Sequence, residues 1–375
     1  MTWTEHDHQA MALALALAAK GRGWVEPNPM VGAVVVDREG TIIASGRHER
    51  HGGPHAEVLA LGQAGQRAHG ATLYVTLEPC CHHGKTPPCT DLVTASGVAR
   101  VVAAMSDPFP EVSGRGLAIL EAAGIDVAVG LMEEAARVLN APYLKRLTTG
   151  RPHVLAKWAM TLDGKAATAS GDSRWISGEA SRAMVHETRG VMDAILVGLG
   201  TVLADDPELT ARPPGARVPI RIVLDSQAAT PHSCRLVQSA RQVPLVIAVN
   251  DHAPPPARER LSRLGAEILS FPGRGRIPIG ELLDELGRRG HSNLLVEGGG
   301  TVLGSFLEES AVDAVDVYLA PVIEGGDHAR SPARGRGLEL MRDATRLERV
   351  QTQTLGDDIR VQGWIPQPWR SKVGL

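Results

Sequence analysis

Hydrophobic and polar positions along the first part of the chain follow the patterns of short strands and helices. The segment from Gln9 to Lys20 alternates Ala and Leu, lacks β-branched residues and is followed by Gly21 and Gly23, which favours a helix. Val31 to Asp37 and Thr41 to Ser45 flank an Arg-Glu-Gly turn and therefore predict a β-hairpin.

The remainder of the first part continues with alternating elements. Helices are expected at His55 to Ala68, Thr90 to Ser96, Arg115 to Ala123 and Glu133 to Leu147. Strands are expected at Thr72 to Leu77, Val98 to Ala104 and Ile125 to Val129. This alternation predicts a three-layer α/β domain.

The second part shows the same alternation. Strands are expected at Val154 to Trp158, Ala194 to Gly198, Ile220 to Asp225, Val243 to Val249, Asn293 to Val296 and Val315 to Ala320. Helices are expected at Gly178 to Arg189, Ala257 to Leu264, Ile279 to Arg289 and Thr301 to Glu309. The pattern predicts a second, mainly parallel sheet covered by helices.

The two parts meet near Tyr143 to Pro152, where a helical pattern changes through Thr-Thr-Gly-Arg-Pro into an apolar strand. We therefore expect one domain over residues 1–147 and a second over 148–375. At about 150 residues per domain, a chain of 375 residues is long enough for both.

Charge and hydropathy limit the classes of partner. The net charge is −3 and no long basic run occurs, which argues against nucleic acid or an anionic membrane surface as a partner. The longest apolar run, Ala10 to Ala19, is about half of what a bilayer needs. We expect a cytoplasmic protein that acts on small molecules.

Three of the four cysteines lie within ten residues, at Cys80, Cys81 and Cys89, which points to a metal rather than to a disulfide framework. The sequence His55-Ala56-Glu57 precedes them. One imidazole and two thiolates, from His55, Cys80 and Cys89, suit tetrahedral Zn²⁺ and leave a fourth position open for water. Glu57, which is not a ligand in this scheme, is placed to carry protons from that water to a leaving amine.

The pattern H-x-E…P-C…C is typical of zinc-dependent base and nucleoside deaminases. Eight residues separate Cys80 from Cys89, whereas two are common in such enzymes, so the longer loop must have a role of its own. A closed structural zinc site remains an alternative, because Cys81, His82 or His83 could supply a fourth ligand.

The second part carries a weaker signal. It has no G-x-G-x-x-G fingerprint, but the strand at Asn293 to Val296 is followed by Glu297-Gly298-Gly299-Gly300-Thr301 and a helix. Glycines there permit close backbone approach, and free amides at a helix start can hold a pyrophosphate. A simple turn explains the same residues, so both interpretations stay open.

Several longer runs, taken together, resemble the bifunctional riboflavin-biosynthesis deaminase/reductase family over nearly the whole chain. In the first part they are Pro27-Asn28-Pro29-Met30-Val31-Gly32, His48, His55-Ala56-Glu57 and the segment from Tyr74 to Cys89 with its His-His-Gly-Lys-Thr-Pro-Pro loop. In the second part they are Lys157 to Lys165, Ser173-Arg174-Trp175-Ile176, Gly200 to Pro207 and Val296 to Thr301.

The resemblance implies a cytidine-deaminase-like α/β domain followed by a dihydrofolate-reductase-like α/β domain that binds NADPH without a Rossmann fingerprint. The first domain would remove the 2-amino group of a diaminopyrimidinone ribosylamine 5′-phosphate as ammonia. The second would use NADPH to reduce the ribosyl unit of the resulting aminouracil to ribityl. The partners would be these small phosphorylated pyrimidines, and a homo-oligomer is expected.

The resemblance also assigns residues in the deaminase domain. His55, Cys80 and Cys89 would bind zinc and Glu57 would be the proton shuttle. The first substrate would be contacted by Asn28, His48, His82 and Lys85. An amide such as Asn28 can donate and accept on a pyrimidine edge, and a lysine such as Lys85 suits a phosphate.

In the reductase domain the resemblance implies two groups of binding residues. NADPH would be contacted by Ala159, Trp175, Thr201, Asp205, Ser226, Gly299, Gly300, Thr301, Val302, Leu303, Gly304 and Ser305. The substrate would be contacted by Ser173, Arg189, Leu209, Arg212 and Glu297. The polar groups best suited to polarise or protonate the opening sugar are Lys157, Asp205 and Glu297.

Alternatives remain for these residues and for the whole chain. Arg189 and Arg212 suit a sugar phosphate because guanidinium groups bind its oxygens bidentately, but either could be an ordinary surface charge. Lys157 could equally be a strand-end lysine bound to a buried acid. A nucleoside or tRNA deaminase with a C-terminal domain that only binds is a rival function, and so is a zinc-containing binding module without turnover.

Overall fold

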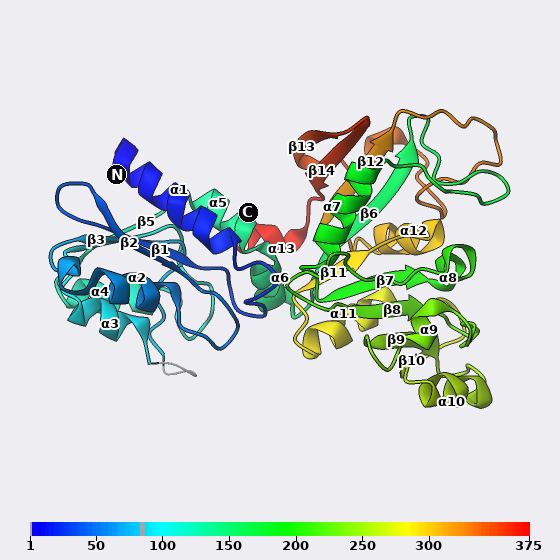
Figure 1. Ribbon diagram of the computed structural model, residues 1–375, viewed down its shortest axis with the longest axis horizontal. Coiled ribbons are helices and arrows are strands. Elements are labelled where there is room, and N and C mark those ends of the chain that lie inside the picture. The colour runs from blue at the N-terminus through cyan, green and yellow to red at the C-terminus, as the bar shows by residue number, and fades with distance from the viewer. Residues whose placement is uncertain (1, 83–86) are drawn as a thin grey trace. The chain divides into compact units, whose positions relative to one another are not determined.

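The structure, a computed structural model, describes residues 2–82 and 87–375, which form two compact units (Figure 1). Unit 1 comprises Met1–Thr149 and Trp369–Leu375, and unit 2 comprises Gly150–Pro368. The sequence assigns everything after residue 147 to the second part, whereas the last seven residues belong to unit 1. There, the Arg137 guanidinium donates a hydrogen bond to the carbonyl oxygen of Val373.

Unit 1 contains a five-stranded sheet in the order β2-β1-β3-β4-β5. The strands are β1 (Gly32–Val36), β2 (Ile42–Arg47), β3 (Thr72–Val75), β4 (Arg100–Ala103) and β5 (Asp126–Val129). β1 is antiparallel to β2 and β3, and β3, β4 and β5 are parallel to one another. The helices are α1 (Glu5–Ala19), α2 (Ala56–Ala64), α3 (Cys89–Ala95), α4 (Arg115–Ala122), α5 (Glu133–Leu139) and α6 (Ala141–Thr149).

Two glycines show that helices cover both faces of this sheet. Gly32 of β1 lies so close to α1 that a Cβ atom would stand 2.0 Å from the Ala14 carbonyl oxygen. Gly46 of β2 approaches α2 in the same way, with the Ala56 carbonyl oxygen 2.5 Å from such an atom. Gly46 pairs with Ala33, the neighbour of Gly32, so the two glycines face opposite sides of the sheet. The predicted three-layer α/β domain is confirmed.

The helix predicted from Glu133 to Leu147 is divided in two at Asn140. The Asn140 side chain accepts a hydrogen bond from the Met30 amide at 2.7 Å and donates one to the Met30 carbonyl oxygen at 3.0 Å. Asn140 is fully buried between α5 and α6, and Pro142 follows it in the sequence. These two hydrogen bonds tie the junction of α5 and α6 to the segment that precedes β1.

Unit 2 contains a nine-stranded sheet in the order β10-β9-β8-β7-β11-β6-β12-β14-β13. The strands are β6 (His153–Thr161), β7 (Ala194–Gly198), β8 (Ile220–Leu224), β9 (Leu245–Asn250), β10 (Glu267–Phe271), β11 (Asn293–Val296), β12 (Ala314–Ala320), β13 (Glu348–Leu355) and β14 (Asp358–Trp364). All strands from β10 through β12 in this sheet order are parallel to one another. β14 and β13 extend the sheet at the β12 edge, each antiparallel to its neighbour. The mainly parallel sheet is confirmed, with an antiparallel ribbon that the sequence pattern does not predict.

Helices cover both faces of this sheet as well. They are α7 (Glu179–Arg189), α8 (Leu199–Asp205), α9 (Arg235–Gln238), α10 (Pro255–Arg263), α11 (Ile279–Arg288) and α12 (Gly300–Glu308), and a short α13 (Pro368–Ser371) crosses the boundary of the units. Along β7, Ala194 and Leu196 belong to one apolar core with α11 and α12, whereas Ile195 and Val197 belong to a second core with α9 and α10. No helix in the described part of the chain is both long and apolar enough to cross a membrane.

Candidate active sites

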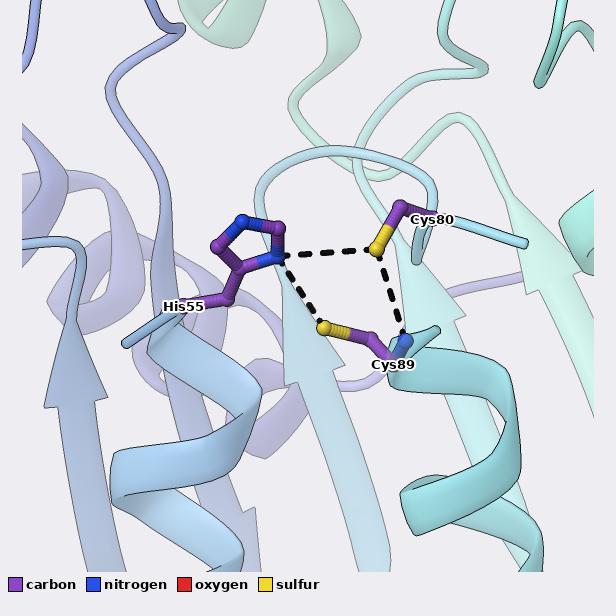
Figure 2. A group of neighbouring side chains, drawn as sticks. All are labelled: His55, Cys80 and Cys89. Atoms are coloured by element: carbon purple, nitrogen blue, oxygen red, sulfur yellow. Dashed lines mark hydrogen bonds between the residues drawn. The ribbon is translucent and has the colours of Figure 1, made fainter. Parts of the chain in front are cut away.

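His55, Cys80 and Cys89, from two helix starts and one loop of unit 1, come together in space (Figure 2). Their ligand atoms all lie within 4.8 Å of one another. The Nδ1 atom of His55 is 3.2 Å from the Cys89 sulfur and 3.5 Å from the Cys80 sulfur. Figure 2 shows the imidazole and both sulfurs turned toward a common centre.

Local structure explains this convergence. His55 is the N-cap of α2, Cys89 is the first residue of α3, and Cys80 lies in the loop that follows β3. The backbone amide of Cys89 points at the Cys80 sulfur at 3.4 Å. Free amides and the helix dipole at a helix start stabilise a thiolate.

The electrostatic surroundings favour ionised sulfur. Hydrogen bonds from Cys89 and from His55 lower the pKa of the Cys80 thiol to about 4, although burial opposes this. The hydrogen bond to Cys80 raises the pKa of His55 and that of Cys89, because protons on these neighbours stabilise the thiolate. One nitrogen and two sulfurs at this spacing fit a tetrahedral Zn²⁺, which would replace the shared protons.

Among the described residues, the candidates for a fourth zinc ligand point elsewhere. This favours a site with a position open for water over a closed structural site. Cys81 points its sulfur at the Glu111 carbonyl oxygen at 3.6 Å, and the His82 ring packs against Phe109 with centroids 5.7 Å apart. Neither belongs to the group of possible ligands. His83 lies outside the described residues.

A cavity of about 370 Å³ opens beside the three ligands. Six of the predicted residues of unit 1 line it, namely Asn28, His48, His55, Glu57, Cys80 and His82. The Glu57 side chain is buried in the first turn of α2, and burial raises the pKa of its carboxyl group. Lys85 lies outside the described residues.

The orientation of Asn28 follows from a chain of hydrogen bonds. The Pro54 carbonyl oxygen can only accept, so Nδ1 of His48 carries the proton and donates to it at 2.9 Å. Nε2 of His48 then accepts from the Asn28 amide nitrogen at 3.3 Å. This arrangement leaves the Asn28 carbonyl oxygen available to accept from an N–H group of a ligand.

The same cavity has lining residues that the sequence analysis does not single out. Tyr143 donates to Asp107 at 2.9 Å, and burial raises the pKa of the Asp107 carboxyl group. Arg146 is the one arginine or lysine in the lining as far as the structure describes it, and its Nε atom is buried without a hydrogen-bond partner. Tyr143 and Arg146 reach the cavity from α6, outside the motifs that carry the resemblance, and Asp107 reaches it from the loop after β4.

Unit 2 holds a larger cavity of about 780 Å³. Its lining includes predicted residues of both groups, namely Lys157, Ala159, Ser173, Trp175, Arg189, Thr201, Asp205, Leu209, Arg212, Glu297, Gly299, Gly300 and Leu303. Burial raises the pKa of the Asp205 carboxyl group and lowers the pKa of the Lys157 amine.

A buried ion pair forms one wall of this cavity. Arg189 donates from Nε and Nη2 to the two carboxylate oxygens of Glu297, each at 2.5 Å. Burial opposes the charge on Glu297, but the charge and hydrogen bonds of Arg189 lower its pKa. The guanidinium edge of Arg189 is therefore occupied in this structure. Arg212 pairs with Glu208 and is exposed.

A neighbouring cavity of about 310 Å³ shares Thr201 and Gly299 with the larger one. The predicted residues Ser226, Thr301, Val302 and Ser305 line it. Gly304 lines neither cavity. A Cβ atom there would stand 1.5 Å from the Arg334 carbonyl oxygen, so Gly304 permits close packing of α12.

The start of α12 suits a phosphate group. Gly298 and Gly299 have φ angles of +95° and +76°, which glycine adopts without strain. The turn they make brings the first amides of α12 to the edge of both cavities, where a pyrophosphate can be held. Arg276, which the sequence analysis does not single out, lines the smaller cavity and donates to Ser305 at 3.1 Å.

Two family models match the chain. The RibD C-terminal domain matches residues 152–361, and the cytidine and deoxycytidylate deaminase zinc-binding region matches residues 4–105. They correspond to unit 2 and to most of unit 1, and the predicted fold class of a deaminase-like domain followed by a reductase-like domain is confirmed.

Whole-length relatives agree with this division. The chain is 45% identical to the riboflavin biosynthesis protein RibD of Actinobacillus pleuropneumoniae, over 93% of each protein. The Acinetobacter baumannii RibD structure matches 97% of this chain and 99% of its own with a TM-score of 0.86 at 36% identity. A deaminase/reductase structure from Thermotoga maritima matches 96% and 99% with a TM-score of 0.84, also at 36% identity. The chain therefore belongs to the RibD family of riboflavin biosynthesis proteins.

Proposed function

We propose that this chain catalyses two consecutive steps of riboflavin biosynthesis, one in each unit. Unit 1 hydrolyses the 2-amino group of 2,5-diamino-6-(5-phosphoribosylamino)pyrimidin-4(3H)-one and releases ammonia. Unit 2 reduces the ribosyl group of the resulting aminouracil to ribityl at the expense of NADPH. The Thermotoga maritima relative is named as a deaminase of that type of pyrimidine and a reductase of 5-amino-6-(5-phosphoribosylamino)uracil.

The observation that carries the deaminase proposal is the group of three ligand atoms at the wall of a cavity that also contains Glu57. His55, Cys80 and Cys89 would hold Zn²⁺, which supplies a Lewis acid that lowers the pKa of water. Glu57 takes a proton from water as the new C–O bond forms and delivers it to the departing nitrogen as the C–N bond breaks. Its raised pKa suits a group that must both accept and donate a proton.

Asn28 and His48 hold the pyrimidine in this proposal. The free carbonyl oxygen of Asn28 accepts from a ring or amino N–H, and its orientation is fixed by His48 and Pro54. Tyr143 and Asp107 contribute a further polar group on the cavity wall. Arg146 offers a positive charge for the 5′-phosphate, the role that the sequence analysis expects of Lys85.

The reductase proposal is supported by the two neighbouring cavities of unit 2 and by the family match. NADPH, when bound, supplies the reducing equivalents. The residues around the start of α12, with Thr201 and Ser226, would hold it, and Arg212, Ser173 and Leu209 would face the substrate. Glu297, held by Arg189, and the Lys157 amine are placed to hold or transfer a proton at the opening sugar.

The test uses the purified full chain with zinc and NADPH. Supplied with the diaminopyrimidinone phosphate, it should release ammonia, and NADPH absorbance should then fall. Cytidine and adenosine should release none. Ammonia from either nucleoside, without turnover of the phosphorylated pyrimidine, would favour the rival nucleoside deaminase, and binding without any ammonia would favour the module that lacks turnover.

The oligomeric state stays a prediction. Light scattering of the purified protein should give a mass of at least twice that of one chain. A mass equal to that of one chain would overturn the expected homo-oligomer.

A further inference from the structure

Four side chains of unit 2 share one face of the sheet where β6, β12 and β14 lie side by side. Lys157 of β6 pairs with Asp316 of β12, and Tyr318 of β12 pairs with Arg360 of β14. Paired residues, and residues two apart on one strand, face the same side of a sheet. Lys157, Asp316, Tyr318 and Arg360 therefore form one polar cluster behind the larger cavity, which Lys157 lines.

Both carboxylates near Lys157 are occupied by arginines. Arg360 donates from Nε and Nη2 to the two oxygens of Asp316 at 2.7 and 2.9 Å, and the Tyr318 hydroxyl donates to the same group at 3.1 Å. Glu297 is held by Arg189 in the same bidentate manner. Asp316 is fully buried, and the Glu297 side chain is 6% exposed, so neither charge is satisfied by solvent.

Lys157 is left without a carboxylate of its own. Its nitrogen forms no hydrogen bond or ion pair with any residue that the structure describes, and it lies 5.5 Å from the centre of the Tyr318 ring. The cluster and the neighbouring Arg189–Glu297 pair together hold three cations, Lys157, Arg189 and Arg360, against two carboxylates. Lys157, the unpaired cation, lines the larger cavity together with the Arg189–Glu297 pair.

We infer that Arg360 is a positioning residue that keeps the Lys157 amine available to the reductase substrate by occupying the carboxylate that would otherwise bind it. Asp316 in turn orients Arg360 and Tyr318, and the Tyr318 ring supports the amine with its π face. The group that the Lys157 amine would bind is a hydrogen-bond acceptor on the substrate. This inference rests on the proposed reductase function and adds three residues of β12 and β14 to it.

The experiment compares Arg360→Met with the double variant Asp316→Asn/Arg360→Met in the full chain. Supplied with the aminouracil phosphate and NADPH, Arg360→Met should lose about tenfold or more in kcat/KM of reduction, because the freed Asp316 carboxylate then binds Lys157. The limb of the pH profile that depends on Lys157 should move to higher pH, since a carboxylate partner stabilises the ammonium form. The double variant has no carboxylate at this place and should recover most of the activity.

Arg151→Met is the matched control. Arg151 makes the same bidentate contact with Asp284, at 2.6 and 2.9 Å, on an exposed surface away from both cavities. It should leave the rate and the pH profile of reduction unchanged.

Three results would overturn the inference: wild-type activity in Arg360→Met, an equal loss in the single and double variants, or an unchanged pH profile despite lost activity. A variant that does not fold would show as lost NADPH binding, and Arg360→Lys then replaces it. That variant keeps a charge beside Asp316 and should retain the wild-type pH profile, and a shifted profile would count against the inference. Failure of the wild-type chain to oxidise NADPH would instead refute the proposed function.

Discussion

Cys80 and Cys81 are adjacent in the sequence, but their thiols have different surroundings. Hydrogen bonds from Cys89 and His55 lower the pKa of the Cys80 thiol to about 4, whereas burial raises the pKa of Cys81. The Cys81 sulfur is directed at the Glu111 carbonyl oxygen and not at the group of ligands. At the residue scale, the proposed metal site therefore depends on which of two neighbouring thiols faces His55.

A pair of serine substitutions tests this distinction. Cys89→Ser should lose bound zinc and ammonia release, because a hydroxyl is a much weaker ligand than a thiolate. Cys81→Ser should keep both at the wild-type level. Zinc content by atomic absorption and ammonia release are measured on the same samples. Loss of zinc in Cys81→Ser would indicate a site closed by a third cysteine and would remove the open position.

Arg146 is expected to matter for the phosphate and not for the ring. Its Nε atom is buried and unpaired beside the cavity, so Arg146→Ala should raise KM for the phosphorylated pyrimidine about tenfold while an analogue without phosphate is unaffected. Arg67→Ala is the control, because Arg67 is exposed and bonded to the Ile43 carbonyl oxygen. An equal effect of Arg146→Ala on both compounds would place the residue elsewhere in the mechanism.

At the scale of elements, α1 is attached to the sheet through Asp7. Asp7 completes a capping box with Thr4, accepts from Tyr74 of β3 at 2.7 Å and pairs with Arg100 of β4 at 3.1 Å. Burial alone would raise the pKa of the Asp7 carboxyl group, but the hydrogen bonds from Thr4 and Tyr74 and the charge of Arg100 lower it to about 2. One carboxylate therefore joins the start of a helix to two strands.

The depressed pKa predicts a pH-dependent stability. The ionised Asp7 carboxylate stabilises the folded unit at pH values above about 4, the ordinary range of an aspartate pKa, and this contribution disappears as the pH falls through about 2. Asp7→Asn should lower the free energy of unfolding by about 2 kcal/mol at pH 7 and by less at pH 3. Urea unfolding at both pH values, with hydrogen exchange of the α1 amides, measures the difference.

Asp126→Asn is the control for that measurement. Asp126 pairs with the same Arg100 at 3.4 Å but is 70% exposed, so its removal should change the free energy of unfolding very little. If Asp7→Asn proved as harmless as Asp126→Asn at pH 7, the attachment of α1 through Asp7 would be refuted.

Most buried elements could be predicted from the sequence, whereas the exposed ribbon of β13 and β14 could not. The parallel strands β7, β9 and β11 are almost continuous apolar runs because helices cover both faces of the sheet. β13, with the sequence ERVQTQTL, is mostly exposed, so it carries no apolar run and its pairing with β14 is decided by the fold. Pro142 is a local signal for the division of α5 from α6, but the contact between Asn140 and Met30 that fixes the junction is contained in no local pattern.

The candidate sites also contain features that the sequence could predict and features that it could not. His55, Cys80 and Cys89 could be predicted because ligand chemistry and spacing are visible in the sequence. The pairing of Arg189 with Glu297 could not be, since the two residues lie 108 positions apart and the sequence assigns each of them to the substrate.

At the scale of the whole molecule, the residues of the two proposed reactions lie in different units. Every described lining residue of the zinc cavity belongs to unit 1, and every lining residue of the two further cavities belongs to unit 2. The sheets of the two units are separate, and the three large apolar cores of the described residues each lie within one unit. Damage to one site should therefore leave the other reaction intact.

The most direct measurement assays Glu57→Gln and Glu297→Gln in the full chain, each with both substrates. Glu57→Gln should retain zinc, lose ammonia release by at least about a hundredfold and still oxidise NADPH when given the aminouracil phosphate. Glu297→Gln should release ammonia at the wild-type rate and fail to oxidise NADPH. If either variant lost both reactions or kept both, the assignment of one reaction to each unit would be contradicted.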